Sequence, residues 1–131
     1  MNHSVVHFEI PADDPDKLVA FYGSLFGWQI DKMPSEGMEY WGIRTVPTDD
    51  KGMPTEPGGI NGGLMRRQAP AQRPINYVNV ESVDEFVGKA KALGASVMVE
   101  KSPVPGMGWF AQLIDPQGNP FAVWQTDMSA G

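Results

Sequence analysis

The chain has 131 residues, a formal net charge of −6, 41% hydrophobic residues and no cysteine. This hydrophobic content excludes a disordered chain, and the acidic balance disfavours duplex nucleic acid and anionic lipid as partners. Without cysteine there is no disulfide, no thiol nucleophile and no thiolate zinc site, so any metal must be held by His, Asp or Glu. The sequence has no apolar run of membrane-spanning length and no signal-peptide pattern, which predicts a cytoplasmic protein with no membrane partner.

The first half of the chain is expected to form a βαβββ module. A β-rich strand over 5–10 is followed by Asp14 at a helix N-cap position, Pro15 at the first helical position and Gly27 at the helix end. Apolar residues between them recur at helical spacing; they are Leu18, Phe21, Tyr22, Leu25 and Phe26. Further strands are predicted over 28–33, 39–46 and 60–65, with a turn-rich loop over 47–59.

The second half repeats this order after a polar linker with two prolines. A strand over 75–81 precedes Ser82 and Glu85, which have capping-box spacing, and a helix that ends at Gly94. Strands over 96–101, 109–115 and 121–125 complete it, with "SPVPGMGW" (102–109) as a connector or a lid and "DPQGN" as a hairpin turn. The predicted organisation is one domain over 1–131, with module one at 1–65, the linker at 66–73 and module two at 74–128.

The two halves align at a nearly constant offset. His7 aligns with Asn76, and Tyr40-Trp41 aligns with Trp109-Phe110, each 69 residues apart. A half of this size does not easily close a core alone, so two curved sheets with outer helices are expected to enclose a cleft. That cleft is the default ligand site.

Three stretches of this sequence resemble the vicinal oxygen chelate superfamily, the group of glyoxalase I, bleomycin-resistance proteins and extradiol dioxygenases. They are "HFEIPADDPDKLVAFYGSLFGW" (7–28), "LGASV" (93–97) and "DPQGNPFAVWQ" (115–125). The resemblance implies an α+β fold in which two βαβββ modules form an open, U-shaped barrel. In metal-using members, a divalent ion in the cleft chelates two neighbouring substrate oxygens and stabilises the charge that develops on them.

The resemblance also implies where the metal ligands would stand. The first-strand position of module one falls on His7, and its counterpart in module two falls on Asn76, whose neutral oxygen is a poor ligand for a transition metal. The last-strand positions fall on Ala122 and near Gly62 or Gly63, which have no donor. Glu9 lies two residues after His7 on the same strand face and could join it as a ligand, as could Glu39 or Glu100 with a shift in register.

Three roles for His7 therefore remain open: a metal ligand with Glu9, a hydrogen-bonding or acid–base group without metal, and a structural residue. Strand alternation gives a set of candidates for contacting a ligand in the cleft; they are Trp41, Asn61, Asn76, Trp109, Gln112 and Trp124.

Two classes of function follow from these expectations. The first is a glyoxalase-like or bleomycin-resistance-like protein that binds a small organic molecule in the inter-module cleft, without the family metal or another cofactor. The alternative is a divalent-metal-dependent lyase or isomerase of the glyoxalase type; a metal-independent enzyme that uses His7 as a general base also remains open. An extradiol dioxygenase is disfavoured, because its iron needs two histidines and a carboxylate. By analogy with the family, we expect a homodimer.

Overall fold

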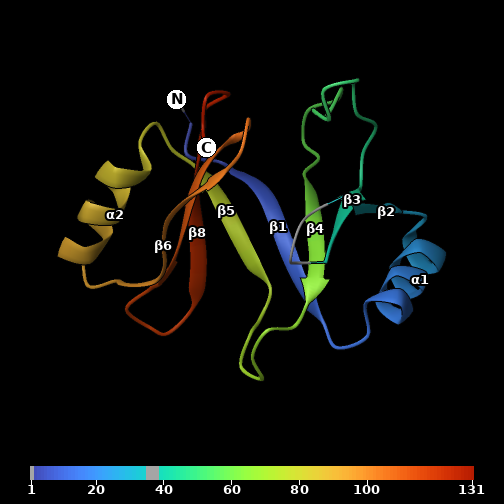
Figure 1. Cartoon of the computed structure of the whole chain (residues 1–131), viewed down its shortest axis with the longest axis horizontal. Coiled ribbons are helices and arrows are strands. Elements are labelled where there is room, and N and C mark those ends of the chain that lie inside the picture. Colours follow the sequence, from blue (N-terminus) through green and yellow to red (C-terminus); the bar gives the residue numbers. More distant parts are fainter. Residues whose placement is uncertain (1, 35–38) are drawn as a thin grey trace. The chain divides into compact units, whose positions relative to one another are not determined.

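A computed structural model describes residues 2–34 and 39–131, and within these ranges it contains eight strands and two helices (Figure 1). The α+β fold expected from the sequence is confirmed. The chain packs as two compact units. One is His7–Pro74, and the other combines Ile75–Gly131 with the N-terminal residues up to Val6. Each unit contains four strands and one helix and is described by itself.

The unit His7–Pro74 contains one βαβββ module, as expected. Its strands have the order β2-β3-β4-β1, with β1 parallel to β4 and the other neighbours antiparallel. The elements are β1 (Val5–Ala12), whose first two residues belong to the other unit, α1 (Pro15–Phe26), β2 (Gln29–Met33), β3 (Tyr40–Arg44) and β4 (Asn61–Arg66). β4 therefore includes Arg66, which the sequence had placed in the linker.

The ends of α1 follow the predicted capping chemistry. The Asp14 side chain accepts a hydrogen bond from the Lys17 amide at 3.2 Å, and Pro15 opens the helix. At the other end, Gly27 adopts a left-handed conformation with φ 72°, and its amide donates to the Gly23 carbonyl at 2.9 Å. Both prolyl geometry and glycine's tolerance of positive φ favour this start and stop.

The apolar side predicted for α1 is only partly buried. Leu18 and Val19 pack on the sheet, where they cover a buried cluster that consists of Ala12, Trp41, Ile43 and Leu64. Phe21, Leu25 and Phe26 remain more than half exposed. Helical spacing marks an apolar stripe but does not fix its width, so the sequence pattern included side chains that lie outside the sheet contact.

The second unit repeats the same topology, with strand order β5-β8-β7-β6 and β5 parallel to β8. Its elements are β5 (Ile75–Asn79), α2 (Val83–Ala92), β6 (Ser96–Val104), β7 (Gly108–Ile114) and β8 (Pro120–Thr126). The Ser82 side chain caps α2 by accepting from the Glu85 amide at 3.1 Å, as its spacing predicts. The segment 102–109, expected to be a loop, is instead a hairpin in which Val104 pairs with Gly108.

The glycines of β4 allow close backbone approach between β1 and β4. A Cβ atom at Gly62 would lie 2.5 Å from the carbonyl oxygen of Phe8, its partner in the strand pairing. A backbone oxygen in a sheet cannot move aside as a flexible side chain can. Gly62 is therefore required by packing, and the sequence "INGGLM" is a strand despite its weak β-propensity.

We predict that Gly62→Ala lowers the free energy of unfolding by about 1–3 kcal/mol, because the added methyl group overpacks the β1–β4 contact. Gly88→Ala is the matched control. A Cβ atom at Gly88 meets nothing within 4 Å in α2, so this change should raise the free energy of unfolding by about 0.5–1 kcal/mol. Urea unfolding of the three proteins measures both values. Equal stability of Gly62→Ala and wild type would refute the packing argument.

Candidate functional site

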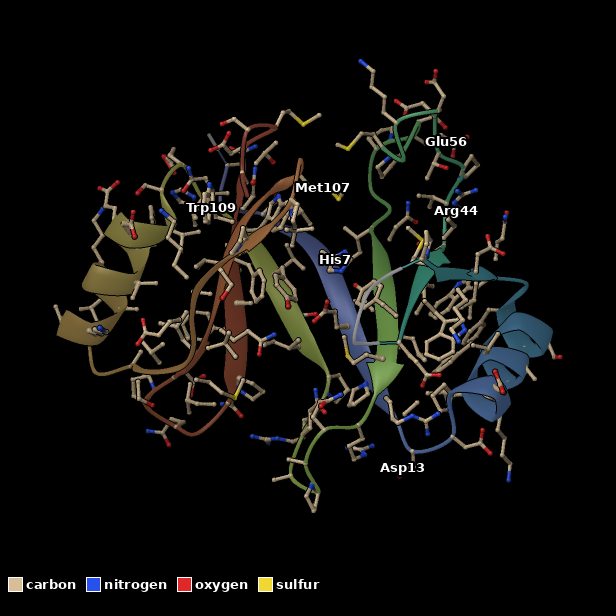
Figure 2. All side chains as sticks on the ribbon, viewed as in Figure 1. His7, Asp13, Arg44, Glu56, Met107 and Trp109 are labelled. Carbon is tan, nitrogen blue, oxygen red and sulfur yellow. The ribbon has the colours of Figure 1, made fainter. Side chains whose placement is uncertain are left out.

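The two faces of the sheet in the unit His7–Pro74 differ in chemistry. Strand pairing sets His7 opposite Asn61 and Glu9 opposite Gly63, while β3 sets Tyr40 opposite Met65. Because side chains alternate along a strand, these residues share the face that points away from the core packed on α1. Figure 2 shows His7 on β1, and Asp13 follows the far end of the same strand.

The hydroxyl of Tyr40 joins His7 to Glu9 on this face. It donates to Glu9 Oε2 at 2.9 Å and lies 2.9 Å from His7 Nε2, while Nε2 and Oε2 are 3.7 Å apart. The side chain of Glu9 is 13% exposed and that of His7 is 35% exposed. A hydroxyl has one proton, so with that proton directed to Glu9, the imidazole donates Nε2–H to the hydroxyl oxygen. The three groups form a continuous hydrogen-bonded chain.

Gly63 makes room for the Tyr40 hydroxyl. A Cβ atom at Gly63 would lie 1.8 Å from the hydroxyl oxygen and 2.2 Å from Cζ of the same ring. No side chain at position 63 is compatible with Tyr40 in this place. The glycine that the sequence marked as an empty ligand position is thus directly beside the hydroxyl that connects His7 and Glu9.

The donor set of this face does not fit the metal ion that the fold family implies. A catalytic ion of this kind usually takes about three protein ligands. Among residues 2–34 and 39–131, no group of three or more His, Cys, Asp or Glu side chains is placed to hold an ion. His7 and Glu9 supply only two possible metal ligands on this face, and both side chains are hydrogen-bonded to the Tyr40 hydroxyl.

The tryptophans that sequence alternation assigned to the ligand face require correction. Trp41 is 6% exposed and belongs to the cluster packed on α1, opposite to the face that carries Tyr40. Trp109 packs with the cluster under α2, and its Nε1 donates to Asp127 at 3.0 Å. The phase chosen for these two strands was wrong by one residue, and such a slip exchanges the two faces of a sheet.

The alignment of His7 with Asn76 at offset 69 was one residue out of phase and placed Asn76 on the wrong face. Asn76 is exposed, whereas its neighbour Tyr77 pairs with Ala122 and packs in a cluster with it. Gln112 lies on this second face, where its side-chain amide donates to the Tyr77 hydroxyl at 2.9 Å. Trp124 packs against the cluster. Sequence reasoning missed Tyr77 and Tyr40 as site residues, because alternation within one strand does not show which side chains of another strand share its face.

Asn61 has a structural role at the start of β4. Its side-chain oxygen accepts from the amides of Thr45 at 2.8 Å and Val46 at 3.3 Å. Its side-chain nitrogen is buried and has no hydrogen-bond partner among the described residues. The carbonyl of this side chain is therefore engaged in closing the β3–β4 connection rather than available to a ligand.

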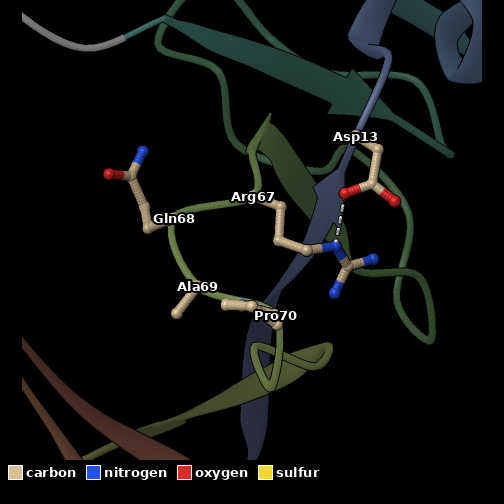
Figure 3. A pocket seen from close by; sticks show the side chains of 5 residues that line it. All are labelled: Asp13, Arg67, Gln68, Ala69 and Pro70. Atoms are coloured by element: carbon tan, nitrogen blue, oxygen red, sulfur yellow. Dashed lines mark hydrogen bonds and ion pairs between the residues drawn. The ribbon is translucent and has the colours of Figure 1, made fainter.

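A surface pocket of about 640 Å³ lies away from the polar face, where the chain leaves β4 (Figure 3). It is lined by Asp13, Arg67, Gln68, Ala69 and Pro70 and contains none of the groups that meet at Tyr40. Arg67 Nε donates to Asp13 Oδ1 at 2.9 Å, so the carboxylate neutralises the guanidinium. Arg67 also donates to the Gln72 carbonyl. These bonds hold the expected linker against the end of β1.

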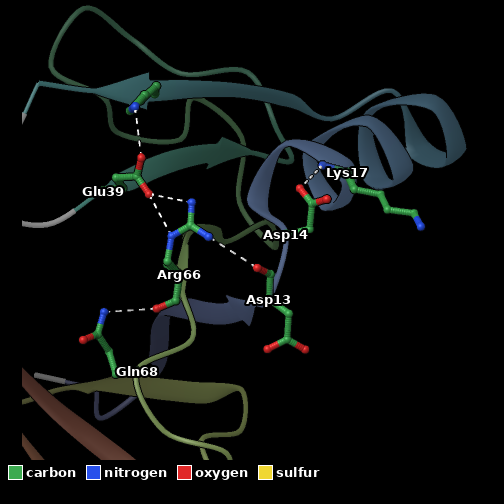
Figure 4. A network of polar contacts seen from close by, with 7 residues as sticks. Asp13, Asp14, Lys17, Glu39, Arg66 and Gln68 are labelled. Atoms are coloured by element: carbon green, nitrogen blue, oxygen red, sulfur yellow. Dashed lines mark hydrogen bonds and ion pairs between the residues drawn. The ribbon is translucent and has the colours of Figure 1, made fainter.

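An exposed ionic network stands beside this pocket (Figure 4). Arg66 Nε donates to Glu39 Oε2 at 3.0 Å, and Lys32 Nζ lies 3.5 Å from Glu39 Oε1. The hydrogen bond from Arg66, with the charges of Arg66 and Lys32, holds the pKa of Glu39 below its ordinary value. The carboxylate of Glu39 is therefore engaged in ion pairs with Arg66 and Lys32 on the protein surface.

We predict that Arg66→Met raises the pKa of Glu39 toward its ordinary value, because the largest cause of its lowering is removed. A lowered folded-state pKa contributes stability above the unfolded-state pKa, and this contribution is lost as pH falls through the folded-state value. The variant should therefore lose less stability on acidification than wild type. A carboxyl NMR titration measures the shift. Lys89→Met, which removes an ion pair in α2, is the control and should leave Glu39 unchanged.

No helix within the described residues is both long and apolar enough to cross a membrane.

Comparisons with known proteins agree with this geometry. Residues 6–124 match the family model of the glyoxalase-like domain. The protein named "Putative glyoxylase CFP32" of Mycobacterium bovis is 32% identical over 119 residues, which cover 88% of this chain and 41% of that protein. The Mycobacterium tuberculosis protein of the same name matches equally well. The chain thus spans about two fifths of the length of these curated relatives.

Solved structures share the fold at low sequence identity. The Streptomyces coelicolor methylmalonyl-CoA epimerase in complex with 2-nitronate-propionyl-CoA has a TM-score of 0.67 at 16% identity, covering 96% of this chain and 99% of that one. The hypothetical protein BH1468 from Bacillus halodurans C-125 has a TM-score of 0.67 at 15% identity, covering 100% and 99%. The expected relation to the vicinal oxygen chelate superfamily is confirmed. With the family model matched over most of its length, the chain belongs to the glyoxalase-like domain family.

Proposed function

We propose that this protein binds a small organic molecule on the polar face of the unit His7–Pro74, with His7, Tyr40 and Glu9 as its polar contacts. The observation that carries the proposal is the Tyr40 hydroxyl, which holds His7 Nε2 and Glu9 Oε2 at 2.9 Å each on one sheet face. Polar groups fixed in this way are typical of a binding site, since their orientation is set before a ligand arrives. The family metal is not part of this proposal.

The chemistry of the face favours a ligand that donates hydrogen bonds. An ionised Glu9 only accepts, and its side chain is more buried than that of His7. The net charge of −6 further opposes a small anion. We therefore propose a neutral or cationic molecule with hydroxyl, amide or amine groups. A Streptomyces coelicolor neighbour is named as a complex with an acyl-CoA analogue, so acyl-CoA thioesters belong in the test panel as the anionic alternative.

The two histidines of the chain provide a matched test. We expect a panel of hydroxylated, amide and amine metabolites to contain a compound that raises the melting temperature of wild type, with or without chelator, since a ligand that binds only the folded state stabilises it. His7→Ala should abolish the shift because it removes a contact residue. His3→Ala should preserve it, because His3 bonds to the Asn79 carbonyl in the other unit. Loss of the shift in both variants, or in neither, would refute the assignment to this face.

A divalent-metal-dependent lyase or isomerase of the glyoxalase type is the second candidate. The observation that favours it is the 3.7 Å separation of His7 Nε2 and Glu9 Oε2, which one ion with bonds of about 2.1 Å could span. The name of the mycobacterial relatives agrees with such an activity. Elemental analysis of untagged protein after growth with added Ni, Co, Zn, Mn and Fe separates the two candidates. A near-stoichiometric ion that His7→Ala removes would favour the enzyme, and a metal-free protein would favour the binding function.

The homodimer expected from the family stays a prediction, and light scattering of the purified protein measures it.

A further inference from the structure

We propose that the Tyr40 hydroxyl takes the place of a third ligand side chain and closes the His7–Glu9 pair to metal. This inference deepens the proposed function by naming what keeps the site free of an ion. It concerns the metal ion alone. It can therefore fail while the organic ligand still binds, and it can hold although no organic ligand binds.

His7 Nε2 lies 3.7 Å from Glu9 Oε2 and is the nitrogen that meets the Tyr40 hydroxyl. An imidazole nitrogen has a single in-plane direction, which carries either a hydrogen or a lone pair that can bind a metal. At His7 Nε2 this direction is taken by the Tyr40 hydroxyl at 2.9 Å. Because the hydroxyl proton is directed to Glu9, Nε2 carries a hydrogen and presents no lone pair. A metal would have to displace this hydrogen and break the bond to Tyr40.

Gly63 pairs with Glu9 across the parallel β1–β4 contact, so a side chain at 63 would share the face and level of Glu9. The three atoms nearest to a Cβ built at Gly63 all belong to Tyr40, beginning with its hydroxyl oxygen at 1.8 Å. A third donor at position 63 and Tyr40 in its present place therefore exclude one another. With Tyr40 and Gly63 in place, His7 and Glu9 are left as the two possible metal ligands. Both are hydrogen-bonded to Tyr40, which also excludes a third ligand side chain at position 63.

Metal titrations of Tyr40 variants test the inference directly. Isothermal titration calorimetry with Zn²⁺ alone, and with Ni²⁺ alone, is run on untagged protein. Tyr40→Ala should bind at least about tenfold more tightly than wild type, since it removes the hydrogen bonds to His7 and Glu9 that a metal would otherwise have to break. His7→Ala/Tyr40→Ala and Glu9→Gln/Tyr40→Ala are the controls and should lose this gain. Tyr40→Leu keeps apolar bulk on the sheet and carries the same expectation should Tyr40→Ala not fold.

A second pair of variants tests the exclusion at position 63. Adding Gly63→Glu to Tyr40→Ala supplies a third donor and should tighten Zn²⁺ binding by a further factor of about ten or more, as three protein ligands replace two. Adding Gly63→Gln instead is the matched control; it has nearly the same shape but a weaker, neutral donor, so its gain should be smaller.

Two results would overturn the inference. One is wild-type protein that binds Zn²⁺ or Ni²⁺ as tightly as Tyr40→Ala and loses the ion in His7→Ala, which would make Tyr40 compatible with the metal or itself a ligand. The other is folded Tyr40→Ala and Tyr40→Leu protein with no gain in affinity. The thermal-shift response to the organic panel is measured on the same wild-type protein. The metal titration therefore does not decide whether the organic ligand binds, because the thermal-shift measurement tests that proposal separately.

Discussion

The hydrogen-bonded chain from Glu9 through Tyr40 to His7 is the constraint on which the chemistry of this protein depends. One hydroxyl satisfies two polar side chains at 2.9 Å each, and its position requires glycine at residue 63. The three groups come from two strands, since β1 supplies His7 and Glu9 and β3 supplies Tyr40. The strand order, which places β4 with its glycine between them, is therefore also the arrangement that assembles the site.

The alternation of side chains in this sheet separates stability from function. One face packs Trp41, Ile43 and Leu64 under α1 and contributes the buried apolar surface that stabilises the unit. The other face carries the polar chain. Because the core does not include His7 or Glu9, replacing them should leave most of the hydrophobic stabilisation in place. The second unit has the same topology but a different polar pair, Gln112 and Tyr77, so the two halves share a fold without sharing a donor set.

Sequence reasoning predicted the fold well because its signals are local. Asp14, Gly27 and Ser82 mark helix ends through backbone chemistry that needs no tertiary information, and the repeated βαβββ order follows from them. The site was harder, because the face of a residue depends on the phase of its strand, and a phase that is wrong by one residue selects Trp41 instead of Tyr40. His7 and Glu9 were placed on one face by their spacing of two. The hydroxyl between them, from a distant strand, has no local signal.

The protonation of His7 Nε2 tests the central claim most directly. Long-range ¹H–¹⁵N NMR of the wild-type protein, at a pH where the ring is neutral, distinguishes the two imidazole tautomers. We expect Nε2 to carry the hydrogen, because the only proton of the Tyr40 hydroxyl is directed to Glu9. A neutral ring with its hydrogen on Nδ1 would contradict the account, since Nε2 would then present a lone pair and be open to a metal ion.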